Sequence, residues 1–258
     1  MSTTFDLIIS ILTIVIPLFG GGITILIFYY RDIMEKEPKV LVIRTFLWGL
    51  VIGTFIILFT IPLFILAQNV IDILTKDWAI IFFMIAILLI EAVLEEAAKG
   101  FVLWRLCFSE PGSIDGLFDG FFYGAIIGTG AGVVDSIAYS LLATDWLQGL
   151  EIALIRTVRI PGTHALFTGI IGIYFAWNKF QGKKITPGIY SSISLHTLWS
   201  IVTYLFHYFL AGTAFYIANF VFLGIYLALI FIIISLLIRY DKKHYPLRKL
   251  DQLSDIVI

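Results

Sequence analysis

Four charged residues interrupt an apolar segment that reads Leu88-Leu-Ile-Glu91-Ala-Val-Leu-Glu95-Glu96-Ala-Ala-Lys99-Gly100. The apolar run covers residues 78–104, enough for a helix to cross ~30 Å of hydrocarbon, which takes roughly 20 residues. A charge at the centre of such a helix costs about 2.5–3.5 kcal/mol, so four together require pairing, water or a ligand.

Glu91, Glu95 and Lys99 recur at spacing four on one helix face, while Glu96 is rotated about 100° away. An ion pair that packs two helices is one interpretation, but two adjacent carboxylates with one cation leave excess negative charge. This excess favours a cation, a metal or a proton-handling role.

Composition extends the membrane interpretation to the whole chain. Of the 258 residues, 60% are hydrophobic and 14% are charged, and the mean hydropathy is +1.01, whereas soluble domains average about a quarter charged. The net charge of −1 gives no sign of nucleic-acid binding. The single cysteine, Cys107, excludes an intramolecular disulfide and Cys-based zinc knuckles.

We therefore predict an all-α, polytopic membrane protein that forms a single membrane-embedded domain over residues 1–258. Backbone hydrogen bonds must close within each crossing segment, so the segments are expected to be helices. About seven stretches are long enough to span, near residues 5–30, 40–67, 78–104, 117–143, 161–178, 187–210 and 213–238.

The Lys and Arg residues predict the orientation, because cytoplasmic loops carry an excess of them. One side receives Arg31, Lys36, Lys39, Arg44, Arg105, Lys179, Lys183, Lys184, Arg239, Lys242, Lys243, Arg248 and Lys249, and the other receives Lys76, Arg156 and Arg159. The bias predicts an outside amino terminus and a cytoplasmic carboxyl terminus, with a basic tail, residues 239–258, lying on the headgroups.

Polar side chains recur in the later segments, and these motif-bearing helices cover roughly residues 78–210. The segment 117–143 has glycines at spacing four, which favours close helix packing, and Asp135 follows them. His164 comes just after Pro161-Gly162, which marks a helix break, and His196 lies within the segment 187–210.

A lone histidine in a helix is more often a packing residue, but depth in the membrane favours a common pocket. Counted at ~1.5 Å per residue, Glu95 and His196 are about 15 Å deep, and Asp135 and His164 are about 20–24 Å deep. Four helices can therefore place carboxylates and imidazoles together, and an intramembrane ionisable residue is a functional hypothesis by default.

The ordered pattern resembles the PrsW family of intramembrane proteases, relatives of the CAAX prenyl endopeptidases. The resemblance runs from about residue 28 to residue 205. It rests on Tyr30-Arg-Asp32, Glu37-Pro38, Phe46-Leu-Trp48-Gly49, Glu95-Glu96-Ala-Ala-Lys99, Gly128-Thr-Gly130 through Asp135-Ser136 to Tyr139, His164-Ala-Leu-Phe-Thr168 and His196-Thr-Leu-Trp199-Ser200. Asp135 stands where the family usually has Glu, Ser136 where it has Asn, and Ser200 where it has Asn or Asp. Because Asp is one methylene shorter than Glu, its partner is expected to come closer.

The resemblance implies an intramembrane endopeptidase with a transmembrane protein substrate, in the cell membrane and in contact with the bilayer. The implied catalytic residues are Glu95, Glu96, His164 and His196, with Glu95 as the general base, and the implied supporting residues are Lys99, Asp135, Ser200 and Glu91. His164, His196 and Asp135 would bind a zinc ion if a metal is used, since oxygen and imidazole ligands suit zinc. A metal-free glutamic mechanism, in which Glu and His activate water directly, stays open.

By family analogy the client is a membrane protein cut in regulated proteolysis, such as an anti-sigma factor. A CAAX-type peptidase acting on a lipidated carboxyl terminus is a second enzyme reading. A small ion-coupled transporter would also bury Glu, Asp, His and Lys at the midplane, but such folds usually show repeats and more spans. A pseudo-protease that binds transmembrane partners without cutting them is the third alternative.

Overall fold

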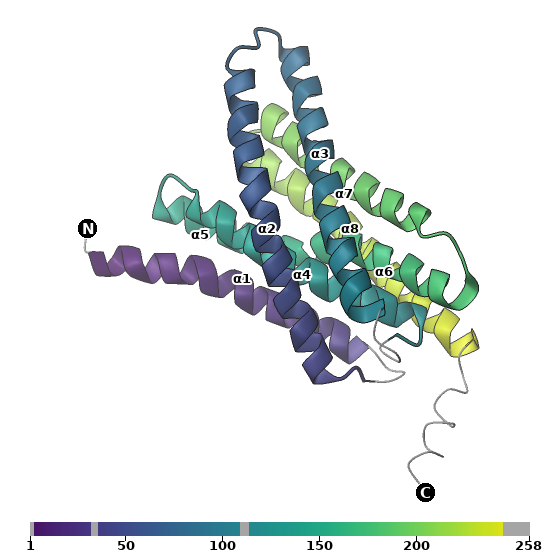
Figure 1. Cartoon of the computed structure of the whole chain (residues 1–258). Helices are drawn as coiled ribbons and strands as arrows, with labels where there is room; N and C mark the ends of the chain where they lie inside the picture. The colour runs from purple at the N-terminus through teal and green to yellow at the C-terminus, as the bar shows by residue number, and fades with distance from the viewer. Residues whose placement is uncertain (1–2, 32–35, 109–113, 245–258) are drawn as a thin grey trace, which may run out of the picture.

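The protein is built from α-helices alone, as the sequence predicts. The computed structural model describes residues 3–31, 36–108 and 114–244, and no strand occurs among them. Its elements (Figure 1) are α1 (Thr3–Arg31), α2 (Lys39–Ile71), α3 (Asp77–Leu103), a π-helical turn (Trp104–Phe108), α4 (Leu117–Leu141), α5 (Trp146–Arg159), a 3₁₀ turn (Ile160–Gly162), α6 (His164–Gln181), α7 (Thr186–Phe209) and α8 (Gly212–His244).

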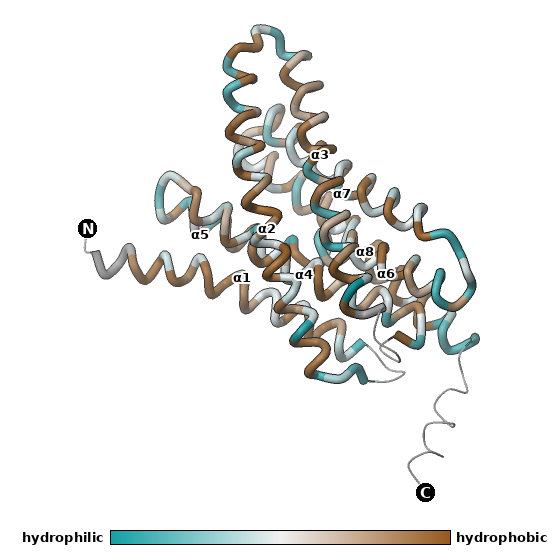
Figure 2. The backbone as a smooth tube through the Cα atoms, in the orientation of Figure 1, coloured by the Kyte–Doolittle hydropathy of each residue, from teal (hydrophilic) through white to brown (hydrophobic). Residues whose placement is uncertain are grey.

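Five of these helices, α1, α2, α3, α4 and α8, are long and apolar enough to cross a membrane. Hydrophobic residues run along their lengths, whereas hydrophilic residues gather at the turns between helices (Figure 2). Each of the seven predicted segments contains a helix with bounds close to those expected. The chain is therefore an all-α membrane protein. The part of the predicted basic tail beyond His244 lies outside the described residues.

Helix α4 is the centre of the bundle. Its most apolar window is 94% buried, against 22–28% for the corresponding windows of the other four apolar helices. Its glycines lie directly against the backbone of α6: a methyl group on Gly120 would overlap the carbonyl of Gly172, and one on Gly128 would overlap the carbonyl of His164. The glycine stripe therefore serves close packing, as predicted, and it fixes the height of His164 along α4.

Helices α5 and α6 together form one broken span that runs antiparallel to α4. Moving forward along α4, Gly120 faces Gly172, Gly128 faces His164, and Ser140 faces Gly149 of α5. The break falls at the 3₁₀ turn, where Pro161 has no N–H to continue the ladder of α5. The Thr163 hydroxyl donates to the carbonyl of Arg159 at 2.9 Å, which satisfies one of the groups exposed by the break.

Helix α5 is an element that the sequence reasoning missed, and Arg156 and Arg159 had been assigned to the outer side. Its 14 residues include Glu151 and both arginines, and about 14 residues are too few to cross a bilayer alone. The helix packs against α1 and α4. Arg156 and Arg159 are partly buried there, whereas Glu151 is exposed.

The far end of α8 completes the start of α4. The N-cap of α4 is Gly116, which has no side chain to accept a hydrogen bond. The buried carboxylate of Asp241 takes that role, accepting from the backbone N–H of Leu117 at 3.1 Å and of Phe118 at 2.8 Å. A residue more than one hundred positions away thereby supplies the cap that local sequence usually supplies.

The close contact between α4 and α6 can be tested with paired glycine substitutions. Gly172→Ala should lower the free energy of unfolding by about 1–3 kcal/mol, because the new methyl group forces two backbones apart. The matched control is Gly224→Ala in α8, where an added methyl group meets nothing within 4 Å and stability should be unchanged or slightly higher. Thermal unfolding in detergent measures both, and equal stability of the two variants would contradict the packing argument.

Candidate active site

Lys99 lies at the centre of a buried ionic cluster on α3. Its side chain is fully buried, and its Nζ donates to Oε2 of Glu95 at 2.6 Å and to Oε1 of Glu96 at 2.9 Å. Both pairs are local, at spacings of four and three along the helix. One ammonium group therefore contacts two carboxylates that point from different faces of α3.

Glu96 is held on every side. Its Oε1 contacts Nδ1 of His196 at 3.0 Å in addition to Lys99, and its Oε2 accepts from Ser192 at 2.9 Å and from Thr168 at 3.2 Å. These partners come from α6 and α7, and the Glu96 side chain is fully buried. Because both oxygens are occupied, Glu96 joins three helices and fixes the ring of His196.

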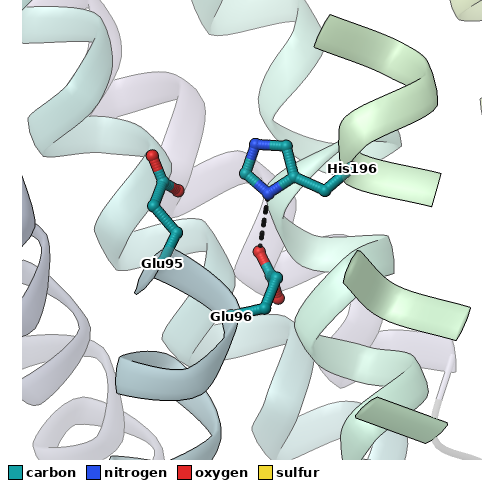
Figure 3. A group of neighbouring side chains, drawn as sticks. All are labelled: Glu95, Glu96 and His196. Atoms are coloured by element: carbon teal, nitrogen blue, oxygen red, sulfur yellow. Dashed lines mark hydrogen bonds and ion pairs between the residues drawn. The ribbon is translucent and has the colours of Figure 1, made fainter. Parts of the chain in front are cut away.

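The ring of His196 is fixed in orientation as well as in position. Figure 3 shows Nδ1 directed at Glu96 and the other ring nitrogen directed away from it. Phe167 of α6 stacks on the same ring, with centroids 4.9 Å apart and planes 21° from parallel. A carboxylate on one nitrogen sets which nitrogen is available for chemistry on the other side of the ring.

A second group continues from Lys99 to α5. Nδ1 of His164 lies 3.2 Å from the Lys99 ammonium, and its Nε2 lies 3.4 Å from Oδ2 of Asp135. Lysine can only donate, so Nδ1 is the acceptor and Nε2 carries the hydrogen that faces Asp135. Asp135 also accepts a hydrogen bond from Arg156, whose guanidinium lies 3.9 Å from the Tyr139 ring centroid.

The two groups form one unbroken chain of polar contacts. It passes from Arg156 on α5 through Asp135 on α4, His164 on α6 and Lys99 on α3 to Glu96 and then to His196 on α7. Positive and negative groups alternate along most of it. Ionisable side chains from five helices are thereby paired inside the apolar bundle, as buried charge requires.

A cavity of about 730 Å³ lies along this chain. Its lining includes Glu91, Glu95, Asp135, Tyr139, Arg156, Arg159, His164, Phe167, His196, Trp199, Ser200 and Asn219. Lys99 and Glu96 are absent from the lining and lie behind it. Glu95 therefore faces the cavity, and its Oε1 has no hydrogen-bond donor among the described residues.

Three side chains in this region are close enough together to bind one metal ion. Glu95, Glu96 and His196 each offer a ligand atom, and the three atoms lie within 4.8 Å of one another (Figure 3). The set expected from the sequence, His164, His196 and Asp135, shares only His196 with this group. In this arrangement both nitrogens of His164 already have polar neighbours, Lys99 and Asp135.

Comparison with known proteins identifies the family. A sequence model described as "PrsW family intramembrane metalloprotease" matches residues 37–234. The chain is 33% identical over 168 residues to "Protease PrsW" of Geobacillus kaustophilus, an alignment that covers 65% of this chain and 67% of the relative. It is 28% identical over 164 residues to "Protease PrsW" of Bacillus subtilis, with 63% and 67% covered. This chain belongs to the PrsW family of intramembrane proteases. No solved structure matches it significantly.

Membership of the PrsW family makes the protein a multi-pass hydrolase of the cell membrane that acts in intramembrane proteolysis. The residues expected from the PrsW resemblance are also gathered in space. Glu91, Glu95, Asp135, His164, His196 and Ser200 line the same cavity, and Lys99 and Glu96 support it from behind.

Two contributors to this PrsW-family site were not identified from the sequence. Ser192 precedes His196 by four residues and so shares its helix face, a spacing that could have identified it. Arg156 precedes His164 in the chain, but its pairing with Asp135 depends on α5 folding back along α4. Asp135, whose short side chain was expected to need a close partner, thus pairs with the guanidinium group of Arg156 on α5.

The central place of Lys99 in this PrsW-family protein leads to a stability test. Lys99→Met keeps the length of the side chain but leaves two buried carboxylates without a cation, so unfolding should become easier by about 3–5 kcal/mol. The control is Lys76→Met in the exposed turn before α3, which should change stability by no more than about 0.5 kcal/mol. Thermal unfolding in detergent separates them. Wild-type stability in Lys99→Met would show that the ammonium does not neutralise the pair.

Proposed function

We propose that this protein hydrolyses a peptide bond of a membrane-embedded substrate with water activated by Glu95 and His196. The observation that carries the proposal is the position of these two groups. Each lines the cavity, and each is fixed from behind by a buried partner, Lys99 for the carboxylate and Glu96 for the imidazole. Fixed geometry of this kind is what proton transfer in a transition state requires.

Glu95 is the proposed general base. Its Oε2 is held by Lys99, and its Oε1 is directed to space that a water molecule can enter. Glu95 would take a proton from that water while the oxygen attacks the carbonyl carbon of the substrate. The same carboxyl group would return the proton to the departing nitrogen as the C–N bond breaks. Lys99 stabilises the carboxylate form of Glu95 before the first of these steps and after the second.

His196 is the proposed partner of the carbonyl oxygen. With Nδ1 bound to Glu96, its other nitrogen can donate a hydrogen bond when protonated and so stabilise the developing oxyanion. Ser200 lies one turn further along α7 and lines the same cavity, so its hydroxyl is a proposed second donor. His164 is proposed to act through Lys99, because it contacts the ammonium and also lies near Oε2 of Glu95 at 3.7 Å.

A zinc ion is proposed to assist at Glu95, Glu96 and His196. Two carboxylates and one imidazole are a donor set that zinc accepts, and the two carboxylates carry one more negative charge than Lys99 neutralises. When bound, zinc supplies a more acidic water at neutral pH. A His196 nitrogen that held zinc would not also donate to the carbonyl oxygen, so the donor role given to His196 belongs to the metal-free mechanism.

Seven crossings with an outside amino terminus are the proposed topology. The directions of the helices agree with it: α2 runs parallel to α4, since Gly49 lies against Ile127 and Gly53 against Ala131, and the broken span α5–α6 runs antiparallel to α4. If the broken span counts as one crossing, α2, α4 and α5–α6 have the relative directions that seven alternating crossings require. The excess of Lys and Arg then lies on the cytoplasmic side.

The proposed client is a protein with a transmembrane segment that enters the cavity from the side, and by analogy an anti-sigma factor is the first class to test. An ion-coupled transporter and a non-catalytic binding protein are not favoured by the matches to proteases. Cleavage of a library of single-span peptides by the purified protein would distinguish an enzyme from both.

Substitution of the proposed base is the direct test. Glu95→Gln preserves size and should lower kcat for such peptides by at least about a hundredfold, because the amide cannot accept the proton from water. Asp72→Asn is the control, since it removes an exposed carboxylate at the end of α2. Unfolding measurements on both variants check the fold. Full activity in a folded Glu95→Gln protein would rule out Glu95 as the base.

The zinc proposal has its own test, which does not depend on activity alone. Elemental analysis of the purified wild-type protein should find about one zinc ion per chain, and His196→Gln should lose it, because about three protein ligands hold a catalytic zinc. A chelator should stop peptide cleavage and added zinc should restore it. Absence of metal together with chelator-resistant cleavage would favour the metal-free mechanism.

A further inference from the structure

Two arginines on α5 lie one turn apart and have different partners. Arg156 forms an ion pair with Asp135. Arg159 also lines the cavity, but no carboxylate among the described residues lies within 4.0 Å of its guanidinium group. Helix α5 therefore places two guanidinium groups at the cavity, one in an ion pair with a carboxylate and one without such a pair.

Neutral groups fix the position of Arg159. Its Nη2 donates to Oδ1 of Asn219 on α8 at 3.0 Å, and its guanidinium lies 5.8 Å from the centroid of the Trp199 ring on α7. Asn219 is itself oriented, because its Nδ2 donates to the carbonyl of Phe215 at 2.9 Å. Trp199 is stacked on Phe222 with centroids 5.2 Å apart. The guanidinium is thus held in place while most of its five N–H donors remain available.

None of the carboxylates that line the cavity forms an ion pair with Arg159, and Asp135 is paired with Arg156 instead. Glu95 is bound to Lys99, and Glu151 accepts from the hydroxyl of Tyr216 at 2.5 Å. Glu91 lies on α3, whereas Arg159 is held against α7 and α8. A guanidinium that is partly desolvated and has no carboxylate in direct contact with it has a strong preference for an anion.

We propose that Arg159 recognises a carboxylate on the substrate peptide, either a Glu or Asp side chain near the cleaved bond or a free carboxyl terminus. This inference rests on the proposed function and assigns a specificity to its cavity. Arginine suits the role because its planar fork binds a carboxylate through two parallel hydrogen bonds. The position of Arg159 favours a peptide ligand over a lipid phosphate, because Arg159 lines the same cavity as Glu95 and His196, where the substrate peptide is proposed to bind.

The experiment uses the purified full-length protein in phosphatidylcholine nanodiscs with matched single-span peptides. The peptides differ at one residue, which is Glu, Gln or Lys, and the position is scanned along the segment. At one or two positions the wild type should cleave the Glu peptide with a kcat/KM about tenfold higher than the Gln peptide. Lys at the same position should be cleaved more slowly than Gln. This comparison needs no variant, so it does not depend on whether a variant folds.

Variants then assign the preference to Arg159. Arg159→Gln should bring the Glu-to-Gln ratio to about one, and Arg159→Lys should retain part of it, since an ammonium binds a carboxylate as a point charge. Lys184→Gln removes the same charge from the exposed turn before α7 and should keep the wild-type ratio.

The outcomes separate the two proposals. A wild type that cleaves Glu and Gln peptides equally at every position, or a ratio unchanged by Arg159→Gln, would overturn the role of Arg159 and leave the protease intact. Failure to cleave any peptide would remove both. If phosphatidylglycerol accelerates all peptides alike through Arg159 and no Glu preference exists, the guanidinium binds lipid phosphate and the peptide proposal is wrong.

Discussion

The site depends on the ion pairs that the buried ammonium group of Lys99 forms with Glu95 and Glu96. A lysine that is fully buried in an apolar bundle must be compensated, and here two carboxylates and one imidazole nitrogen surround it. Each of those groups is tied to another helix in turn. The arrangement of α3, α6 and α7 around the cavity therefore follows from neutralising one charge, and the cavity lies where the pairing leaves one carboxylate oxygen uncovered.

Glu95 and Glu96 are two identical side chains that packing places in different surroundings. They are adjacent in sequence, so about 100° of helix rotation separates them. That rotation directs Glu96 into the contact with α6 and α7, where hydroxyl groups and a histidine saturate it. It directs Glu95 to the cavity. One helical step thus separates the proposed base from the carboxylate that joins α3 to α6 and α7.

Much of this fold could be predicted from length and hydropathy, because a bilayer accepts few structures. The gathering of Glu95, Asp135, His164 and His196 could also be predicted, since counting along each helix places all four in the middle of the bilayer. Helix α5 could not, because it is too short and too charged to satisfy a spanning criterion, and its packing against α1 and α4 is a tertiary contact. Because α5 was not predicted, Arg156 was assigned to the outer side of the membrane. Its ion pair with Asp135 was therefore not predicted. The burial of Glu96 behind the cavity likewise depends on tertiary contacts that helical periodicity does not contain.

The carboxylate of Asp241 has a consequence for the order of biosynthesis. It completes the first turn of α4, yet it belongs to the end of the last described helix. A ribosome that makes the chain from its amino terminus produces α4 long before this residue exists. The first turn of α4 therefore gains these two hydrogen bonds only once α8 is in place. Shortening the chain before Asp241 would therefore remove the cap of the central helix instead of trimming an appendage.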